Sequence, residues 1–120
     1  MTLAEFEEQV FRLAAYSPVC EIPFVRRQMP VSITIRVPLT VGGFVDAFHN
    51  QATGTTAFTA IQNDRRIFGA DSTGGWHVHP FDDPSQHQAL AAPMTFADFL
   101  AEMERHHGVT EGREVTGPGR

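Results

Sequence analysis

Apolar and polar residues alternate strictly over one seven-residue stretch of the chain. Its apolar positions are Val31, Ile33, Ile35 and Val37, and its polar positions are Ser32, Thr34 and Arg36. Successive side chains of a β-strand point to opposite faces, so this pattern predicts a strand with one apolar and one polar face. Such a strand belongs to a sheet that is covered on one side and open on the other.

Three more β-rich runs follow within a short distance, at Phe44–His49, Thr56–Gln62 and Arg65–Ala70. Asn, Thr and Gly residues between 50 and 54 suit a tight reversal, and Asn63 and Asp64 both tolerate positive φ. Short connections of this kind join antiparallel neighbours. The sequence therefore predicts an antiparallel meander of four strands, or five if the extended stretch around residues 76–79 is included.

An amphipathic helix is predicted at each end of the domain. The first begins with a capping box between Thr2 and Glu5, and the second with a similar pair, Thr95 and Asp98. The apolar stripes are Leu3, Phe6, Val10 and Leu13 in the first helix, and Phe96, Phe99, Leu100 and Met103 in the second. We expect an α+β fold with both helices packed on one face of the sheet. Residues 1–108 would form this domain, and residues 109–120 a flexible C-terminal tail.

Length and cysteine content limit the class of protein. A chain of 120 residues suits one domain. The lone Cys20 cannot form an intramolecular disulfide and no export signal is visible, which predicts a cytoplasmic protein. No apolar run approaches the roughly 20 residues of a membrane-spanning helix, so no membrane association is expected.

All nine basic residues are arginines, and the net charge of the chain is −5. Apart from the pairs Arg26-Arg27 and Arg65-Arg66, the arginines are scattered along the sequence. This composition counts against a general nucleic-acid coat protein. A locally positive surface is still compatible with it, because the field depends on where charges converge in space.

The segment Gly74–Pro80 and the loop after it hold most of the candidate chemistry. His77 and His79 lie two residues apart and would point to the same side of a strand, with Trp76 and Val78 on the other side. The two imidazoles could thus converge on one small volume. The alternative is that both rings lie on the solvent face of an edge strand.

One interpretation is a metal site. His77 and His79, with either His87 or Asp83, would supply three ligands for zinc or a similar divalent metal and leave one position open for water.

A second interpretation is metal-independent cleavage of RNA, which requires a base, an acid and a cation near the phosphorane. His77 and His79 could fill both proton roles near neutral pH. Arg65 or Arg66 could supply the cation, and Asp71 could orient an imidazole. Alternatively, the arginines lie at a solvated hairpin tip, and Asp71 only stabilises a turn.

The order of these elements resembles that of small toxins of the TumE-like family. The resemblance covers about residues 44–104 and includes Arg-Ile-Phe-x-x-Asp from Arg66 to Asp71, the Trp/His-rich turn and the closing helix. It implies a prokaryotic toxin–antitoxin module with a compact RNase-like α+β toxin and a helix-turn-helix antitoxin protein as its partner. It also implies that Arg66, Asp71, His77 and His79 are the catalytic residues.

Two functional hypotheses follow. The first is an endoribonuclease acting on RNA without a cofactor. The second is a non-catalytic binding protein that holds a metal at the histidines or pairs through its open sheet face with another chain, including a second copy as a homodimer.

The remaining aromatic, histidine and cysteine residues are predicted to be structural. We expect core aromatics at Phe44, Phe48, Phe58 and Phe68, surface histidines at His49, His106 and His107, and a buried thiol at Cys20.

Overall fold

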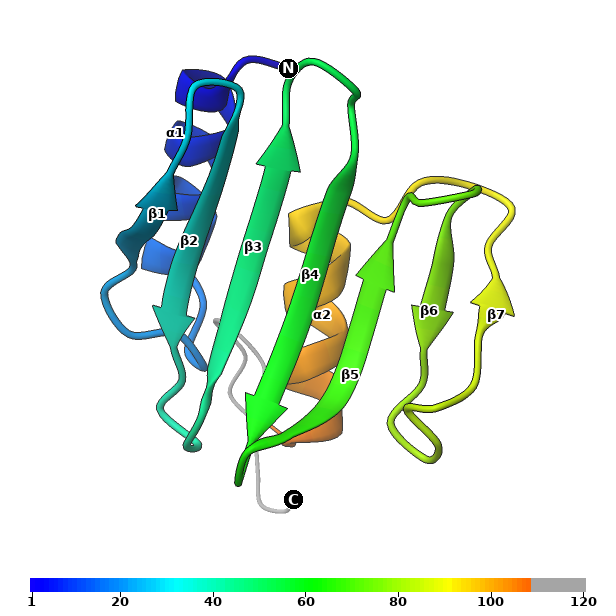
Figure 1. The fold of residues 1–120 in the computed structure, drawn as a ribbon. Coiled ribbons are helices and arrows are strands. Elements are labelled where there is room, and N and C mark those ends of the chain that lie inside the picture. The colour runs from blue at the N-terminus through cyan, green and yellow to red at the C-terminus, as the bar shows by residue number, and fades with distance from the viewer. Residues whose placement is uncertain (109–120) are drawn as a thin grey trace.

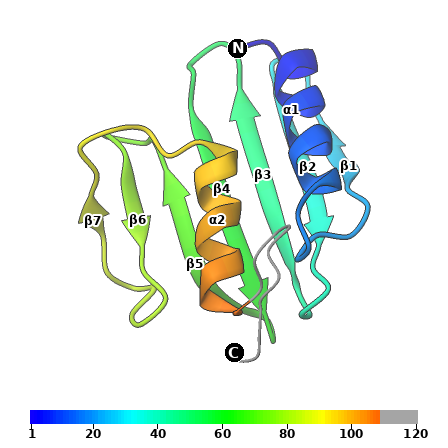
Figure 2. The same cartoon turned by 180° about the vertical axis from the view of Figure 1, so that it is seen from behind.

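Two helices cover one face of a seven-stranded antiparallel sheet in the computed structural model, which describes residues 1–108 (Figures 1 and 2). The helices are α1 (Leu3–Ala15) and α2 (Phe96–His106). The strands are β1 (Phe24–Gln28), β2 (Ser32–Pro38), β3 (Phe44–Asn50), β4 (Thr56–Gln62), β5 (Arg65–Asp71), β6 (His77–His79) and β7 (Gln88–Ala89). Strand order in the sheet equals the order in the chain, so the sheet is a meander. The predicted α+β class is confirmed, but the sheet is larger than the four or five strands expected.

Both helices begin where their capping boxes predict. Thr2 and Thr95 each accept a hydrogen bond from the backbone three residues later, and Glu5 and Asp98 bond back to the cap. Gly108 follows α2 with φ +69°, a conformation that favours glycine at a helix end. Within residues 1–108, neither helix has the length and apolar composition that crossing a membrane requires. The tail expected at residues 109–120 lies outside the described residues.

The core lies between the sheet and the helices. It is built from the apolar stripes of α1 and α2 and from alternate strand residues, including Ile33, Ile35, Val37, Val45, Ala47, Phe58, Ala60, Phe68 and Ala70.

The β4–β5 hairpin turns at Asn63 and Asp64, whose φ angles are +51° and +61°. The predicted positive-φ turn is therefore confirmed.

Strand β3 presents the opposite face to the one expected. Its buried residues are Val45, Ala47 and His49, so Phe44 and Phe48 lie half-buried on the face without helices. The prediction that these two rings belong to the core is wrong, whereas Phe58 and Phe68 are buried as expected.

His49 is a buried histidine rather than a surface group. One ring nitrogen lies 2.8 Å from Thr56 Oγ1 and the other 2.8 Å from the Met1 carbonyl oxygen, and the ring stacks on Phe6 at 5.0 Å. Both polar atoms of the ring are thus satisfied, which makes its burial tolerable.

Strands β1 and β7 form the two edges of the sheet and were absent from the predicted meander. All five residues of β1 are exposed, and its pairing with β2 is interrupted by a bulge between Val25 and Arg27. At the opposite edge, α2 lies over β4 and β5 but not over β6 and β7 (Figure 2). A hollow of about 420 Å³ remains there, lined mainly by Phe68, Val78, Pro80, Phe81, Leu90 and Met94.

Candidate functional site

The histidines of β6 lie on the helix-free face of the sheet, the face that also carries Arg36, Asp46 and Asp71. In the pairing of β5 with β6, Gly69 lies opposite His79 and Asp71 lies opposite His77. Val78, between the two histidines, is buried in the core, and the neighbouring Trp76 packs against that core. The rings of His77 and His79 point the same way, with centroids 5.2 Å apart, as their spacing predicts.

His87 completes a group of three histidines. The loop at residues 80–87 brings its ring to 4.3 Å from His79 and 5.0 Å from His77, measured between centroids. One potential ligand atom from each ring lies within 4.8 Å of the other two. His79 is buried, His77 is half-buried and His87 is exposed, so the group opens to solvent on the His87 side.

Backbone carbonyl groups fix the orientation of two of these rings. His77 Nδ1 lies 3.1 Å from the Gly75 oxygen, and His79 Nδ1 lies 3.0 Å from the Pro84 oxygen. A carbonyl oxygen can only accept, so we assign the hydrogen to Nδ1 in both rings. Nε2 of each ring is consequently the atom left to face the centre of the site.

Burial lowers the pKa of His79, and the nearby charge of Arg66 lowers it further. The hydrogen bond to Pro84 acts in the opposite direction but is a smaller effect. His79 is therefore neutral at pH 7, and its Nε2 carries a lone pair that can accept a proton or bind a metal.

Asp71 faces the two β6 histidines. Its Oδ2 lies 3.3 Å from His77 Nε2 and 3.9 Å from His79 Nε2. Its Oδ1 accepts a hydrogen bond from the Thr73 backbone at 2.9 Å. Asp71 thus both stabilises the turn after β5 and contacts the imidazole of His77.

Gly69 gives Arg66 access to the same site. A Cβ atom at position 69 would lie 3.3 Å from Arg66 Cδ and 3.5 Å from His79 Cδ2, so both side chains lie over this glycine. Arg66 Nη2 donates to the Pro84 oxygen at 3.2 Å, the carbonyl that also accepts from His79. Arg65 is exposed at the β4–β5 hairpin tip, which leaves Arg66 as the arginine beside the histidines.

Two aromatic rings hold the loop against the domain. Phe81 stacks on Phe68 at 4.3 Å and on His106 at 3.7 Å. Burial is the larger cause of the lowered pKa of His106, and His107 adds to it. Sequence reasoning missed this role of Phe81 and His106, because residues so far apart give no local signal that they meet.

Asp83 is not a member of the histidine group. Its Oδ1 accepts hydrogen bonds from the backbone and the hydroxyl group of Ser85, at 3.2 Å and 2.6 Å. The structure thus uses Asp83 to stabilise the loop, and His87 is the third residue that joins His77 and His79.

Cys20 lies apart from this site and is half-buried. Burial raises the pKa of its thiol to about 11, so the reactive thiolate is scarce at neutral pH.

Comparison of the chain with protein-family models, curated proteins and solved structures found no match.

Proposed function

We propose that the protein binds a divalent transition-metal ion, preferably zinc, through His77, His79 and His87. The observation that carries the proposal is the convergence of three imidazole ligand atoms to within 4.8 Å of one another. Neutral imidazole is a common ligand for zinc and related metals.

The hydrogen bonds of the site support this proposal. A metal-bound histidine usually donates its other ring nitrogen to a carbonyl or carboxylate group, which fixes the tautomer and the ring orientation. His77 and His79 both make such a bond, to Gly75 and Pro84. Two of the three proposed ligands are thus oriented before any ion arrives.

Asp71 supplies the negative charge that a cation would need nearby. From zinc–nitrogen bonds of about 2.0–2.1 Å, neighbouring ligand atoms in a tetrahedral site should lie about 3.3 Å apart. The separation of Asp71 Oδ2 from His77 Nε2 is 3.3 Å. Asp71 is accordingly our candidate for a fourth ligand or for a counter-charge, and the exposed His87 is the ring free to adjust.

Metal titration tests this function. Protein made without a histidine tag and stripped with EDTA should bind one cobalt or zinc ion per chain, with a cobalt absorption spectrum typical of nitrogen ligands. His77→Ala, His79→Ala and His87→Ala should each weaken binding, while His107→Ala should not. Substoichiometric binding that is indifferent to the three substitutions would remove the proposal.

A second candidate function is an endoribonuclease like those of TumE-like toxins, acting in the cytoplasm and inhibited by a helix-turn-helix antitoxin. It is supported by the proximity of Arg66, Asp71, His77 and His79. In this proposal the two histidines act as acid and base. Asp71 accepts a hydrogen bond from Nε2 of His77 when that ring is protonated, and Arg66 stabilises the charge that develops on the phosphate.

Expression in bacteria tests the second candidate. The wild-type chain should arrest growth and degrade RNA, and His77→Ala or His79→Ala should abolish both effects while His107→Ala retains them. Purified protein should cleave RNA in the presence of EDTA, since the proposed reaction uses no metal. Normal growth with intact RNA would count against it.

A further inference from the structure

We infer that the helix-free face of the sheet binds single-stranded nucleic acid. The first observation is a separation of charge between the two layers of the domain. The strands carry five arginines and two aspartates, namely Arg26, Arg27, Arg36, Arg65, Arg66, Asp46 and Asp71. The helices carry six carboxylates and two arginines, namely Glu5, Glu7, Glu8, Asp98, Glu102, Glu104, Arg12 and Arg105. The helices thus carry a net charge of −4 and the strands +3, while the connecting loops hold Glu21, Asp64, Asp82 and Asp83.

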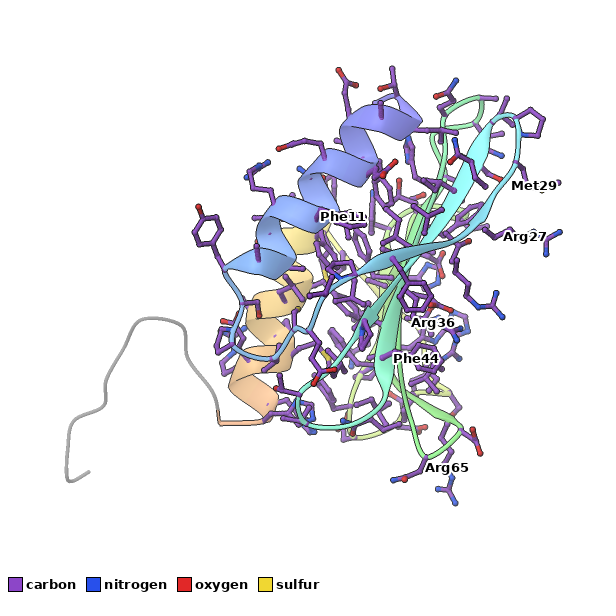
Figure 3. All side chains as sticks on the ribbon, turned by 90° about the vertical axis from the view of Figure 1, so that its left-hand side faces the viewer. Phe11, Arg27, Met29, Arg36, Phe44 and Arg65 are labelled. Atoms are coloured by element: carbon purple, nitrogen blue, oxygen red, sulfur yellow. The ribbon has the colours of Figure 1, made fainter. Side chains whose placement is uncertain are left out.

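Strand register places the basic side chains away from the helices. Arg27 pairs with Thr34, and Phe24 pairs with Arg36. Because Ile33 and Ile35 are buried against the helices, the residues that alternate with them point to the open face. Figure 3 shows Arg27 and Arg36 on that side, with Arg65 at the end of the sheet.

Several of these arginines are free to meet an anionic ligand. Arg36 forms a two-pronged ion pair with Asp46, at 2.8 Å and 2.9 Å. Among the ion pairs within residues 1–108, none uses Arg26, Arg27 or Arg65. These three exposed guanidinium groups are therefore available to phosphates.

The second observation is that aromatic rings share this face. Phe24 is 48% exposed, and Phe44 and Phe48 are half-buried. The Arg36 guanidinium lies over the Phe44 ring, 3.7 Å from its centroid. Unpaired bases can stack on rings and on guanidinium planes, whereas the bases of a duplex are already stacked on one another.

The combination of exposed arginines and aromatic rings favours single-stranded nucleic acid over an acidic protein as the ligand, since an acidic protein would need the arginines but not the rings. Strands in a sheet lie about 4.8 Å apart, so β1 to β6 spans roughly 24 Å. A few nucleotides would cover that distance and reach the histidines at its far end. Binding on this face does not depend on a metal ion or on cleavage.

Fluorescence anisotropy tests the inference in the presence of EDTA. The probes are labelled oligouridine and oligothymidine of about 12 nucleotides at about 50 mM salt. Arg27→Gln/Arg65→Gln should weaken binding by about tenfold or more and reduce the salt slope by about 1.4. The control is Arg12→Gln/Arg105→Gln, which removes the same charge from the helices and should change affinity less than about twofold.

Phe24→Ala tests the stacking contribution and should weaken binding by about fivefold or more. Oligothymidine lacks the 2′-hydroxyl group that the proposed cleavage requires, so its binding in EDTA separates this inference from both proposed functions. No binding at low salt, an equal loss in the helix variant, or preference for a duplex would overturn the inference. Equal affinity for polyglutamate of matched charge would overturn it in favour of an acidic protein partner.

Discussion

Replacing His87 by alanine should remove most of the stability that zinc adds to the protein while leaving the metal-free protein nearly unchanged. The His87 side chain is exposed and lies in the loop between β6 and β7. Exposed substitutions of this kind usually change the free energy of unfolding by no more than about 0.5 kcal/mol. The substitution therefore isolates the contribution of the third ligand.

The magnitude follows from linkage between binding and folding. An ion that binds only the folded protein, at a free concentration of about 100 times its Kd, adds about 2.7 kcal/mol. If loss of one ligand weakens binding about 100-fold, the same concentration equals the new Kd and adds only about 0.4 kcal/mol. For a domain of this size, the zinc-induced rise in Tm should fall from about 10–20 °C to about 2–3 °C.

Differential scanning calorimetry provides the assay. Wild type, His87→Ala and the control His107→Ala are compared first in EDTA and then at one fixed concentration of free zinc. His107 lies outside the group of three histidines, so its variant should keep the full rise in Tm. A full rise in His87→Ala as well would refute the three-histidine site.

Three further predictions concern the stability of the metal-free protein and the residues that support the candidate site. The free energy of unfolding should decrease as pH falls below 6.5, because the lowered pKa of His79 makes the unfolded chain the first to take up a proton. Urea unfolding should show this loss, and His79→Gln should reduce it; an unchanged slope in that variant would contradict the assignment. His49→Ala should cost about 2–4 kcal/mol in urea unfolding, since it removes a buried ring and two hydrogen bonds. Phe81→Ala should weaken zinc binding by about tenfold in titration calorimetry by loosening the loop that carries His87, and an unaltered affinity would show that its stacking is dispensable.

Local signals predicted much of the fold. The capping boxes at Thr2 and Thr95 and the Asn63-Asp64 turn depend on neighbours in the chain, and all three are present. Strand β1 escaped prediction because every one of its residues is exposed, so it has no buried face to impose an alternating pattern. Its pairing with β2 depends on the arrangement of the sheet.

The orientation of β3 depended on packing volume. Phe6, Phe58, Phe96 and Phe99 already occupy the space between the sheet and the helices. The small Val45 and Ala47 of β3 face this crowded layer, His49 stacks on Phe6 at its end, and the two phenylalanines of β3 face outward. Hydrophobicity alone gives the opposite answer, because phenylalanine is the larger apolar residue.

The candidate site, like the fold, was predicted in part from the sequence. Residue spacing was sufficient to place His77 and His79 on one side of a strand. Choosing His87 over Asp83 required the path of an irregular loop, and choosing Arg66 over Arg65 required the register shift between Ala60 and Ile61 in the β4–β5 pairing. These choices depend on tertiary structure.

The position of β6 and β7 at the sheet edge has a dynamic consequence. Neither helix covers these two strands (Figure 2), and β7 is only two residues long. We expect their amide hydrogens to exchange through local opening, in which Val78 and His79 become exposed while the remaining strands and both helices stay folded. A metal ion bound between β6 and the following loop would link the two parts of this hairpin. The residence time of the ion would then depend on how often the hairpin opens.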